Sequence, residues 1–312
     1  MTGSADHGLR VYSLQTGKCL RNLYNKKFGH TDWVTSCKFL DDGRVLSAGM
    51  DNLLCLWDSR IIKCQNLIGH NSTISKIMVD SQNFGISASY DASLLVWNLD
   101  TIECSQGLFN EHKDAVVEFN WKNSLVVSGD RGGSMAIWDV NTGQAVRSMP
   151  GVHKGHISKI EFYSDGQDNN IILSTGLKDG QLIVHDMRSH NPIKFMRIHS
   201  AAVNFIEPSM SGFLVTGSAD KTIKTFDIFN DFKCVQTMKT TDAVFCGKVL
   251  ENIVIVGCGD GNILAYDLDT GECLYGYGVD QAGAVHCLAV NEDRDCLVTG
   301  GDSGQALCVN FI

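Results

Sequence analysis

Three groups of residues in this 312-residue chain have the types and spacing that a chemical site would need. His153 and His156 lie three residues apart, and closely spaced histidines are common zinc ligands. The segment Gly257-Cys258-Gly259-Asp260-Gly261 resembles part of a phosphate-binding loop. Four aspartates at equivalent points of the chain could form a ring of carboxylates: Asp51, Asp91, Asp179 and Asp220.

None of these groups completes a site in the sequence. No cysteine or histidine pair follows His156 at the spacing of a zinc finger. No helix is expected after the glycine-rich segment, although a phosphate loop needs a helix N-terminus. The aspartates share one repeat position, which is typical of turn residues. No Ser–His–Asp or Cys–His set can be assigned, so we expect no enzyme activity, no cofactor and no metal site.

The elements that would carry these residues follow from an internal repeat. A short pattern recurs eight times, in which an apolar run, a turn residue and a second apolar run are followed by an aromatic residue and an aspartate, or by a variant of that pair. Such a period of about 40 residues is the sequence signature of a repeat architecture. The turn positions, spaced by 40 to 47 residues, are Asp6, Asp51, Asp91, Gly132, Asp179, Asp220, Asp260 and Asp302.

Each repeat contains four short apolar runs separated by turn residues, for example Val34–Phe39, Val45–Gly49, Leu54–Trp57 and Cys64–Leu67. No segment shows a sustained period of 3.6 residues, so the pattern predicts short strands and no long helix. A unit of four strands that repeats every 42 residues or so is typical of a propeller blade. The sequence therefore predicts an all-β propeller.

Two pairs of dipeptides resemble the WD40 repeat: Gly29-His30 with Trp57-Asp58, and Gly69-His70 with Trp97-Asn98. In that family a histidine, a serine or threonine, the turn aspartate and the tryptophan form a hydrogen-bonded tetrad. The resemblance implies two structural tetrads here, in which buried indole, imidazole and carboxylate groups satisfy one another. They are His30, Ser47, Asp51, Trp57 and His70, Ser87, Asp91, Trp97.

Later repeats depart from this pattern. One pairs His112, Ser128 and Trp138 with Gly132 in place of the aspartate. In the next repeat His156 is expected in the tetrad position, together with Thr175 and Asp179, and His185 replaces the tryptophan. The tryptophan is replaced in the last three repeats by Phe226, Tyr266 and Cys308.

The sequence leaves the number of blades open between seven and eight. The first repeat starts at its second strand and the last repeat ends after its third, which gives about 30 strands. We expect one domain over residues 1–312 with eight blades, of which the first and last are incomplete. In the seven-bladed alternative, Cys19–Leu23 would complete the last blade.

The resemblance also indicates where a partner would bind. In WD40 propellers, the residue three after the blade histidine and the residue before the turn aspartate gather on the top face. Here one stretch of the chain offers aromatic residues and cations at these positions, whereas later repeats offer alanine and glycine. Aromatic anchors beside cations are typical of binding hot spots. We expect a protein segment with an apolar anchor and acidic residues to bind Trp33, Met50, Thr73, Tyr90, Arg131, Lys159 and Lys178.

A second pattern favours a different function. Leu56-Trp57-Asp58-Ser59-Arg60 fits the W-D-x-R pattern, and His185-Asp186-Met187-Arg188 is a degenerate copy. In the WD40 family this pattern marks some substrate receptors of cullin–RING ubiquitin ligases, in which the arginine faces the adaptor. The two hypotheses are thus a non-enzymatic interaction scaffold and a ligase receptor that uses Arg60.

Composition narrows the partners to proteins. The net charge of −9 lacks the basic footprint of a nucleic-acid binder and disfavours docking on an anionic membrane. No apolar stretch is long enough to span a bilayer, and no secretory signal is visible at the N-terminus. The 12 cysteines are most simply small buried hydrophobes of a reducing compartment. We therefore expect a cytoplasmic protein that binds no nucleic acid, membrane or small-molecule substrate.

Overall fold

The computed structural model describes residues 1–25, 27–163, 171–189, 191–209, 211–279, 283–291, 294 and 296–310. These residues form 30 strands and no helix. None of the described elements is therefore a helix long and apolar enough to cross a membrane. The chain divides into two compact units, Met1–Ile157 and Ser158–Ile312.

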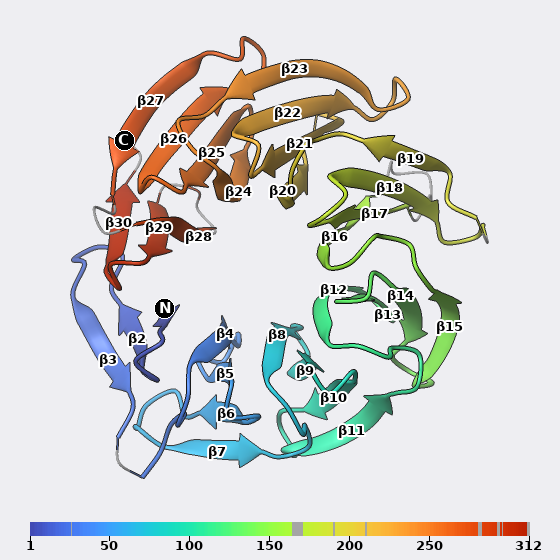
Figure 1. Ribbon diagram of the computed structural model, residues 1–312. Coiled ribbons are helices and arrows are strands. Elements are labelled where there is room, and N and C mark those ends of the chain that lie inside the picture. Colours follow the sequence, from blue (N-terminus) through green and yellow to red (C-terminus); the bar gives the residue numbers. More distant parts are fainter. Residues whose placement is uncertain are drawn as a thin grey trace. The chain divides into compact units, whose positions relative to one another are not determined.

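The strands form eight antiparallel sheets, which are the blades of a β-propeller (Figure 1). The first unit carries blades 1 to 4, which consist of β1 (Thr2–Gly3), β2 (Leu9–Tyr12) and β3 (Cys19–Leu23); β4 (Val34–Phe39), β5 (Val45–Gly49), β6 (Leu54–Trp57) and β7 (Cys64–Leu67); β8 (Ile74–Val79), β9 (Phe84–Ser89), β10 (Leu94–Asn98) and β11 (Glu103–Leu108); and β12 (Val116–Lys122), β13 (Leu125–Asp130), β14 (Met135–Asp139) and β15 (Gln144–Met149).

The second unit carries blades 5 to 8, apart from the first residue of β16. They consist of β16 (Ile157–Tyr163), β17 (Ile171–Gly176), β18 (Gln181–Asp186) and β19 (Lys194–Arg197); β20 (Val203–Pro208), β21 (Phe213–Ser218), β22 (Thr222–Asp227) and β23 (Lys233–Lys239); β24 (Val244–Leu250), β25 (Ile253–Cys258), β26 (Asn262–Asp267) and β27 (Cys273–Gly278); and β28 (Val285–Val290), β29 (Cys296–Gly301) and β30 (Ala306–Asn310).

This strand order confirms eight blades and excludes the seven-bladed alternative. Cys19–Leu23 is β3, and it pairs with β2 of the first blade, with Leu9 opposite Leu23. The first and last blades have three strands each, as the sequence predicts.

The apolar core lies between neighbouring blades. Between blades 2 and 3, Leu54 and Leu67 pack with Leu95 and Trp97 from the next sheet. Between blades 6 and 7, Ile223 and Met238 pack with Val256, Leu264 and Tyr266 from the next sheet. Full burial of one such side chain stabilises the fold by roughly 1.5–3 kcal/mol. The apolar residues of each repeat therefore hold two sheets together.

Among the described residues, a β-bulge near the start of the first strand recurs in six blades, including blades 2, 3 and 6. Such a bulge inserts one extra residue and re-aims its side chain. In blade 2 the extra residue is Thr35, whose hydroxyl donates to the Ile74 carbonyl of blade 3 at 2.6 Å. Ser75 donates in the same way to Val116 O at 2.7 Å, and Asn204 donates to Val244 O at 2.7 Å. The bulges thus add a directional hydrogen bond between neighbouring blades.

Candidate functional site

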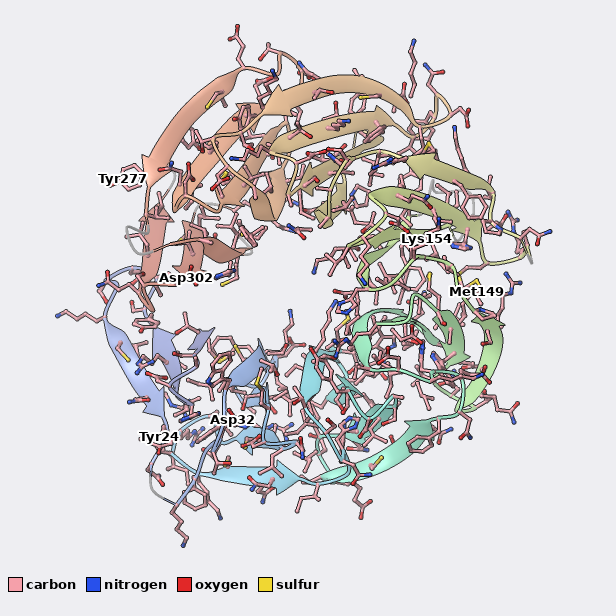
Figure 2. The ribbon with its side chains drawn as sticks, in the orientation of Figure 1. Tyr24, Asp32, Met149, Lys154, Tyr277 and Asp302 are labelled. Atoms are coloured by element: carbon pink, nitrogen blue, oxygen red, sulfur yellow. The ribbon has the colours of Figure 1, made fainter. Side chains whose placement is uncertain are left out.

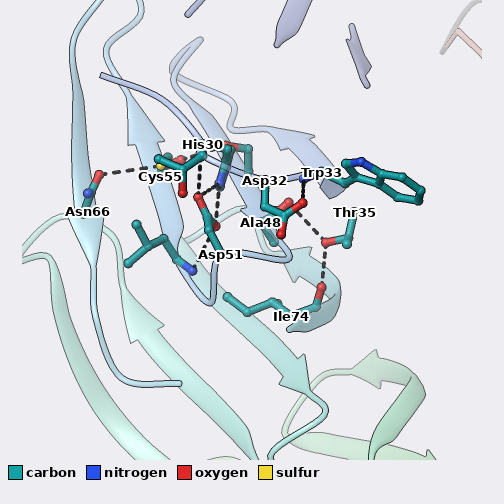
Figure 3. Close-up of polar contacts among 12 residues, drawn as sticks. His30, Asp32, Trp33, Thr35, Ala48, Asp51, Cys55, Asn66 and Ile74 are labelled. Carbon is teal, nitrogen blue, oxygen red and sulfur yellow. Dashed lines mark hydrogen bonds and ion pairs between the residues drawn. The ribbon is translucent and has the colours of Figure 1, made fainter. Parts of the chain in front are cut away.

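Blade 2 contains a hydrogen-bond network of the four predicted residues, and Figure 3 shows the contact between His30 and Asp51. His30 Nδ1 lies 3.0 Å from Asp51 Oδ1, and His30 Nε2 lies 2.8 Å from Ser47 Oγ. Trp57 donates its indole N–H to the same Ser47 Oγ at 2.9 Å. A neutral imidazole that donates from Nδ1 and accepts at Nε2 satisfies every partner, since the serine hydroxyl can donate to Nε2. His30, Ser47 and Trp57 are almost fully buried.

Blade 3 repeats this geometry. His70 Nδ1 lies 3.0 Å from Asp91 Oδ2, His70 Nε2 lies 2.7 Å from Ser87 Oγ, and Trp97 donates to Ser87 Oγ at 2.8 Å. Burial lowers the pKa of His70, although Asp91 opposes the shift. A neutral histidine with both ring nitrogens occupied has no atom left for a substrate or a metal. The two tetrads therefore stabilise their blades rather than form a reaction centre.

Blade 4 corrects one expectation. The turn residue Gly132 has no carboxylate, yet His112 Nδ1 lies 3.0 Å from Asp130 Oδ2. His112 Nε2 lies 2.6 Å from Ser128 Oγ, and Trp138 donates to that oxygen at 2.8 Å. The carboxylate comes from the last residue of β13, two residues before the expected position, so the tetrad is complete.

Blade 5 corrects two more expectations. The tetrad histidines of blades 2, 3, 4 and 6 lie four residues before the first strand of their blade. In blade 5 that residue is His153, which is 4% exposed, so the assignment of His156 was wrong by three residues. Thr175 does not take the serine position either. The residue opposite Ile183 is Ser174, and Thr175 Oγ1 lies 2.9 Å from Ser158 Oγ.

In blades 6 to 8, other residue types stand at some of the tetrad positions. In blade 6, His199 contacts Asp220 at 3.0 Å and Thr216 at 2.8 Å, while Phe226 packs in the tryptophan position. In blade 7, Tyr266 donates its hydroxyl to Lys239 O at 2.7 Å, and burial raises the pKa of that hydroxyl to about 12. In blade 8 the register places Thr299 opposite Leu307, so Val309, not Cys308, has the tryptophan position.

The sequence predicts two sets of top-face residues, one before the first strand of each blade and one before the turn position. Main-chain hydrogen bonds join a residue of one set to a residue of the other. The residue before the first strand accepts, at its carbonyl, a hydrogen bond from the N–H of the residue before the turn position. Met50 donates to Trp33 at 2.8 Å and Tyr90 donates to Thr73 at 2.9 Å. We call these residues the rim pairs. The equivalent pairs in other blades are Arg131 with Ala115, Ala219 with Ala202, Gly259 with Ala243, and Asp302 with Ala284.

The rim pair of blade 8 differs from the expected one by one residue. Asp302 (Figure 2), not Gly301, donates its N–H to Ala284 O. Its carboxylate also accepts from the Ala284 N–H at 2.9 Å and lies 2.8 Å from His286 Nε2. Asp302 is therefore a rim residue and not a turn residue of a tetrad.

Blades 2 to 4 present large side chains at the rim. Trp33 is 52% exposed, Tyr90 44% and Met50 38%. The Trp33 ring extends away from the buried tetrad of its own blade (Figure 3). Arg131 lies over the Tyr90 ring, 6.0 Å from its centroid, and donates from Nε to His156 Nε2 at 3.0 Å. We call Trp33, Met50, Thr73, Tyr90, Arg131 and His156 the rim cluster.

His156 belongs to this cluster, although the sequence predicted it as the tetrad histidine of blade 5. It directly precedes β16, as Trp33 and Thr73 precede their strands, so it takes the rim position for which Lys159 was expected. Lys159 is the third residue of β16, and Lys178 is exposed in the turn after β17. Both belong to the second unit, whereas every member of the rim cluster belongs to the first.

Arg60 lies in an exposed turn after β6. Arg21 of blade 1 holds this turn, since its guanidinium donates to Ser59 O at 2.7 Å and to Asp58 O at 2.6 Å. The Arg60 side chain makes no hydrogen bond within the described part of the chain. The next residues, Ile61 and Ile62, are 55% and 46% exposed. Arg188, in the degenerate copy, instead pairs with Asp186 at 2.9 Å.

The described residues contain no group of three or more His, Cys, Asp or Glu side chains that could hold a metal ion. Each of the aspartates Asp51, Asp91 and Asp220 serves its own blade, since each contacts the histidine of that blade.

Comparisons with known proteins agree with this architecture. The family model for the WD domain, G-beta repeat (WD40), matches residues 17–58 and 190–227. Among solved structures, the computationally designed Ika8 protein has a TM-score of 0.84 and 26% sequence identity, and the likeness covers 99% of this chain and 92% of that chain.

Two curated relatives extend the comparison. Mitochondrial division protein 1 of Eremothecium gossypii is 27% identical over 60% of this chain and 30% of its own length. Pre-mRNA-processing factor 19 homolog 2 of Arabidopsis thaliana is 24% identical over 86% of this chain and 52% of its own length. The chain thus spans about a third to a half of these relatives. The two matched repeats and the eight-bladed architecture support a relation of this chain to the WD40-repeat propeller family.

Proposed function

We propose that this protein is a non-enzymatic interaction scaffold that binds a partner protein at the rim cluster of its first unit. WD40 propellers are generally non-catalytic and typically serve as protein-interaction scaffolds. The observation that carries the proposal is the exposure of three large apolar side chains, Trp33, Met50 and Tyr90, in the rim pairs of blades 2 and 3.

The contrast with the second unit supports this choice. Its rim pairs in blades 6 and 7 carry only small residues, namely Ala202, Ala219, Ala243 and Gly259. Small side chains satisfy the same main-chain hydrogen bonds, so the fold does not require a tryptophan or tyrosine there. A large exposed apolar residue that the fold does not need is a cost to solubility unless a partner covers it.

The chemistry of the cluster suggests the kind of segment that binds. Tryptophan, tyrosine and arginine are the side chains most enriched in binding hot spots. Arg131 is held in place by the Tyr90 ring and by His156, so less side-chain entropy is lost when its guanidinium meets a carboxylate. A segment with an apolar anchor next to an acidic residue would match Trp33 and Arg131.

The test is affinity purification from cells, followed by mass spectrometry of the bound proteins. Trp33→Ala/Tyr90→Ala is compared with the wild type and with Phe229→Ala, which removes a 72%-exposed aromatic from blade 6. We expect a partner that binds the wild type and Phe229→Ala, and that the double variant loses. A folded double variant that keeps every partner would refute the rim-cluster proposal.

A second candidate function rests on Arg60. Its exposed side chain, the turn held by Arg21 and the neighbouring Ile61 and Ile62 form a surface that suits a ligase adaptor. Arg60→Ala would then remove a cullin adaptor while the partners of the rim cluster remain. Arg188→Ala is the matched control, because Arg188 is paired with Asp186 in the degenerate copy. If no adaptor is found with the wild type, the receptor function is excluded.

We further propose a cytoplasmic location and no binding of nucleic acid, membrane or small-molecule substrate. The net charge of −9 supports this part of the proposal. Fluorescence microscopy of the tagged full chain and a nucleic-acid binding assay at low salt test it.

A further inference from the structure

Two cysteines on neighbouring strands of blade 8 face one another. Cys296 opens β29 and Cys308 lies on β30, with their sulfur atoms 2.8 Å apart. A disulfide has a bonded distance of about 2.05 Å, so both side chains are thiols here. Cys308 pairs opposite Val298, two residues beyond Cys296, and residues two apart on a strand share a face of the sheet. We infer that Cys296 and Cys308 form a reversible disulfide under oxidising conditions.

A second cysteine pair shows why this one is singled out. Cys55 and Cys64 of blade 2 have the same diagonal offset, since Cys55 is opposite Asn66 and Cys64 is opposite Trp57. Both of their sulfur atoms contact Asn66 Oδ1 at 3.6 Å, and the two residues are 0% and 6% exposed. An oxidant does not reach buried thiols readily.

The pair in blade 8 is more accessible. Cys296 is 3% exposed, but Cys308 is half-buried on the outermost strand of a three-stranded sheet. In the six complete blades a fourth strand covers the equivalent third strand. Cys308 is therefore the thiol that meets the oxidant first, and Cys296 is the thiol that resolves the intermediate.

The reaction is a thiol–disulfide exchange with a low-molecular-weight disulfide. The Cys308 thiolate attacks one sulfur of the small disulfide, which releases one small thiolate and leaves a mixed disulfide on Cys308. The Cys296 thiolate then attacks the Cys308 sulfur and expels the second small thiolate. Both protein thiols lose a proton and one electron each, and the small disulfide is reduced to two thiols.

The link would tie the edge strand to its neighbour. It closes a short loop, and a closed loop reduces the freedom of the unfolded chain. The oxidised protein should therefore unfold at a midpoint a few degrees higher than the reduced protein. The strand β30 should also exchange its amide hydrogens more slowly after oxidation.

The test uses the reduced full chain and oxidised glutathione as the probe. After incubation, the protein is denatured, its free thiols are alkylated, and it is digested without reductant for mass spectrometry. We expect the peptide that contains Cys296 and Cys308 to be unalkylated at both residues and lighter by two hydrogens, with Cys55 and Cys64 still alkylated. Reduction should reverse the link and the rise in the unfolding midpoint.

Two variants serve as controls. Cys287→Ser removes an exposed thiol of the same blade and should leave the link intact, whereas Cys308→Ser should abolish the rise in midpoint. The wild-type readout needs no variant, so a misfolded Cys308→Ser protein would not obscure it. Full alkylation of Cys296 and Cys308 in the treated wild type, or glutathione retained on Cys308 without a link, would overturn the inference.

Discussion

Asp130 Oδ2 lies 3.0 Å from His112 Nδ1, and this carboxylate comes from the end of a strand rather than from a turn. The two side chains are 1–2% exposed, so neither can exchange its partner for water. The tetrad therefore requires a carboxylate within hydrogen-bond distance of the imidazole, and it does not require that the acid stand at the turn position of the backbone.

This relationship predicts the effect of Asp130→Ala. The substitution leaves the buried Nδ1–H of His112 without an acceptor, which costs about 1–3 kcal/mol of unfolding free energy. Urea unfolding of the variant and the wild type measures the change. Gly132→Asp is the comparison, because it supplies the family's expected residue while Asp130 is already in place. A gain of stability in Gly132→Asp would contradict the assignment of Asp130.

Stability should fall as the pH drops below about 6.5. Burial lowers the pKa of His70 and of His199, so the unfolded chain takes up protons that the folded chain does not. Burial raises the pKa of Asp220, but hydrogen bonds from Thr222 and Ser200, together with His199, outweigh it and lower that pKa to about 2. The contribution of Asp220 is present above its unfolded pKa of 3.8 and is lost between pH 4 and pH 2.

Urea midpoints at pH 7.5, 5.5, 4 and 2.5 measure this dependence. His199→Asn removes one of the titrating groups and should flatten the decline between pH 7 and 5. A midpoint that rises on acidification would show that the histidines are charged in the folded protein.

Thr35→Val should weaken the contact between blades 2 and 3. It removes the hydroxyl that donates to Ile74 O at 2.6 Å and keeps the size of the side chain. We expect a loss of about 0.5–1.5 kcal/mol in thermal or urea unfolding, the usual net contribution of a hydrogen bond. Thr35→Ser keeps the donor and should retain most of the stability. An equal loss in both variants would point to packing of the methyl group instead.

Two glycines with positive φ should respond differently to alanine. Gly133 has a φ of +89°, and a Cβ there would overlap the carbonyl oxygen of His153. Gly17 has a φ of +66° with open space around it. Gly133→Ala adds a steric clash to backbone strain and should cost about 3–4 kcal/mol, against about 1 kcal/mol for Gly17→Ala. Similar losses for the two variants in chemical unfolding would show that the clash relaxes.

The strands and two complete tetrads could be predicted because they depend on local spacing. In blades 2 and 3 the histidine, serine, aspartate and tryptophan follow at nearly constant intervals, and each turn has the same length. The predictions failed where the chain changes length. In blade 5 the serine position is paired across nine residues of chain, Ser174 with Ile183, whereas in blade 2 Ser47 is paired with Cys55 across eight. This extra residue moves the serine position from Thr175 to Ser174.

Other predictions failed because more than one residue in the sequence could fill the same buried position or make the same hydrogen bond. The sequence offers two histidines before β16, and only the distance to the strand shows that His153 and not His156 is the buried one. Tyr266 meets the need for a buried polar ring by donating to a main-chain carbonyl, which no side-chain motif could reveal. The contacts of Arg131 with Tyr90 and His156 could not be predicted from the sequence, because the three residues lie in three separate loops.

Each rim pair is joined by a main-chain hydrogen bond from an N–H to a carbonyl oxygen, as between Met50 and Trp33. Any residue except proline at the donor position can make this bond, so alanine, methionine, tyrosine and arginine all occur there. Mutation at the rim is thus nearly free of consequence for folding. Each blade can acquire or lose a recognition residue independently, and new binding specificities can evolve on this scaffold one position at a time.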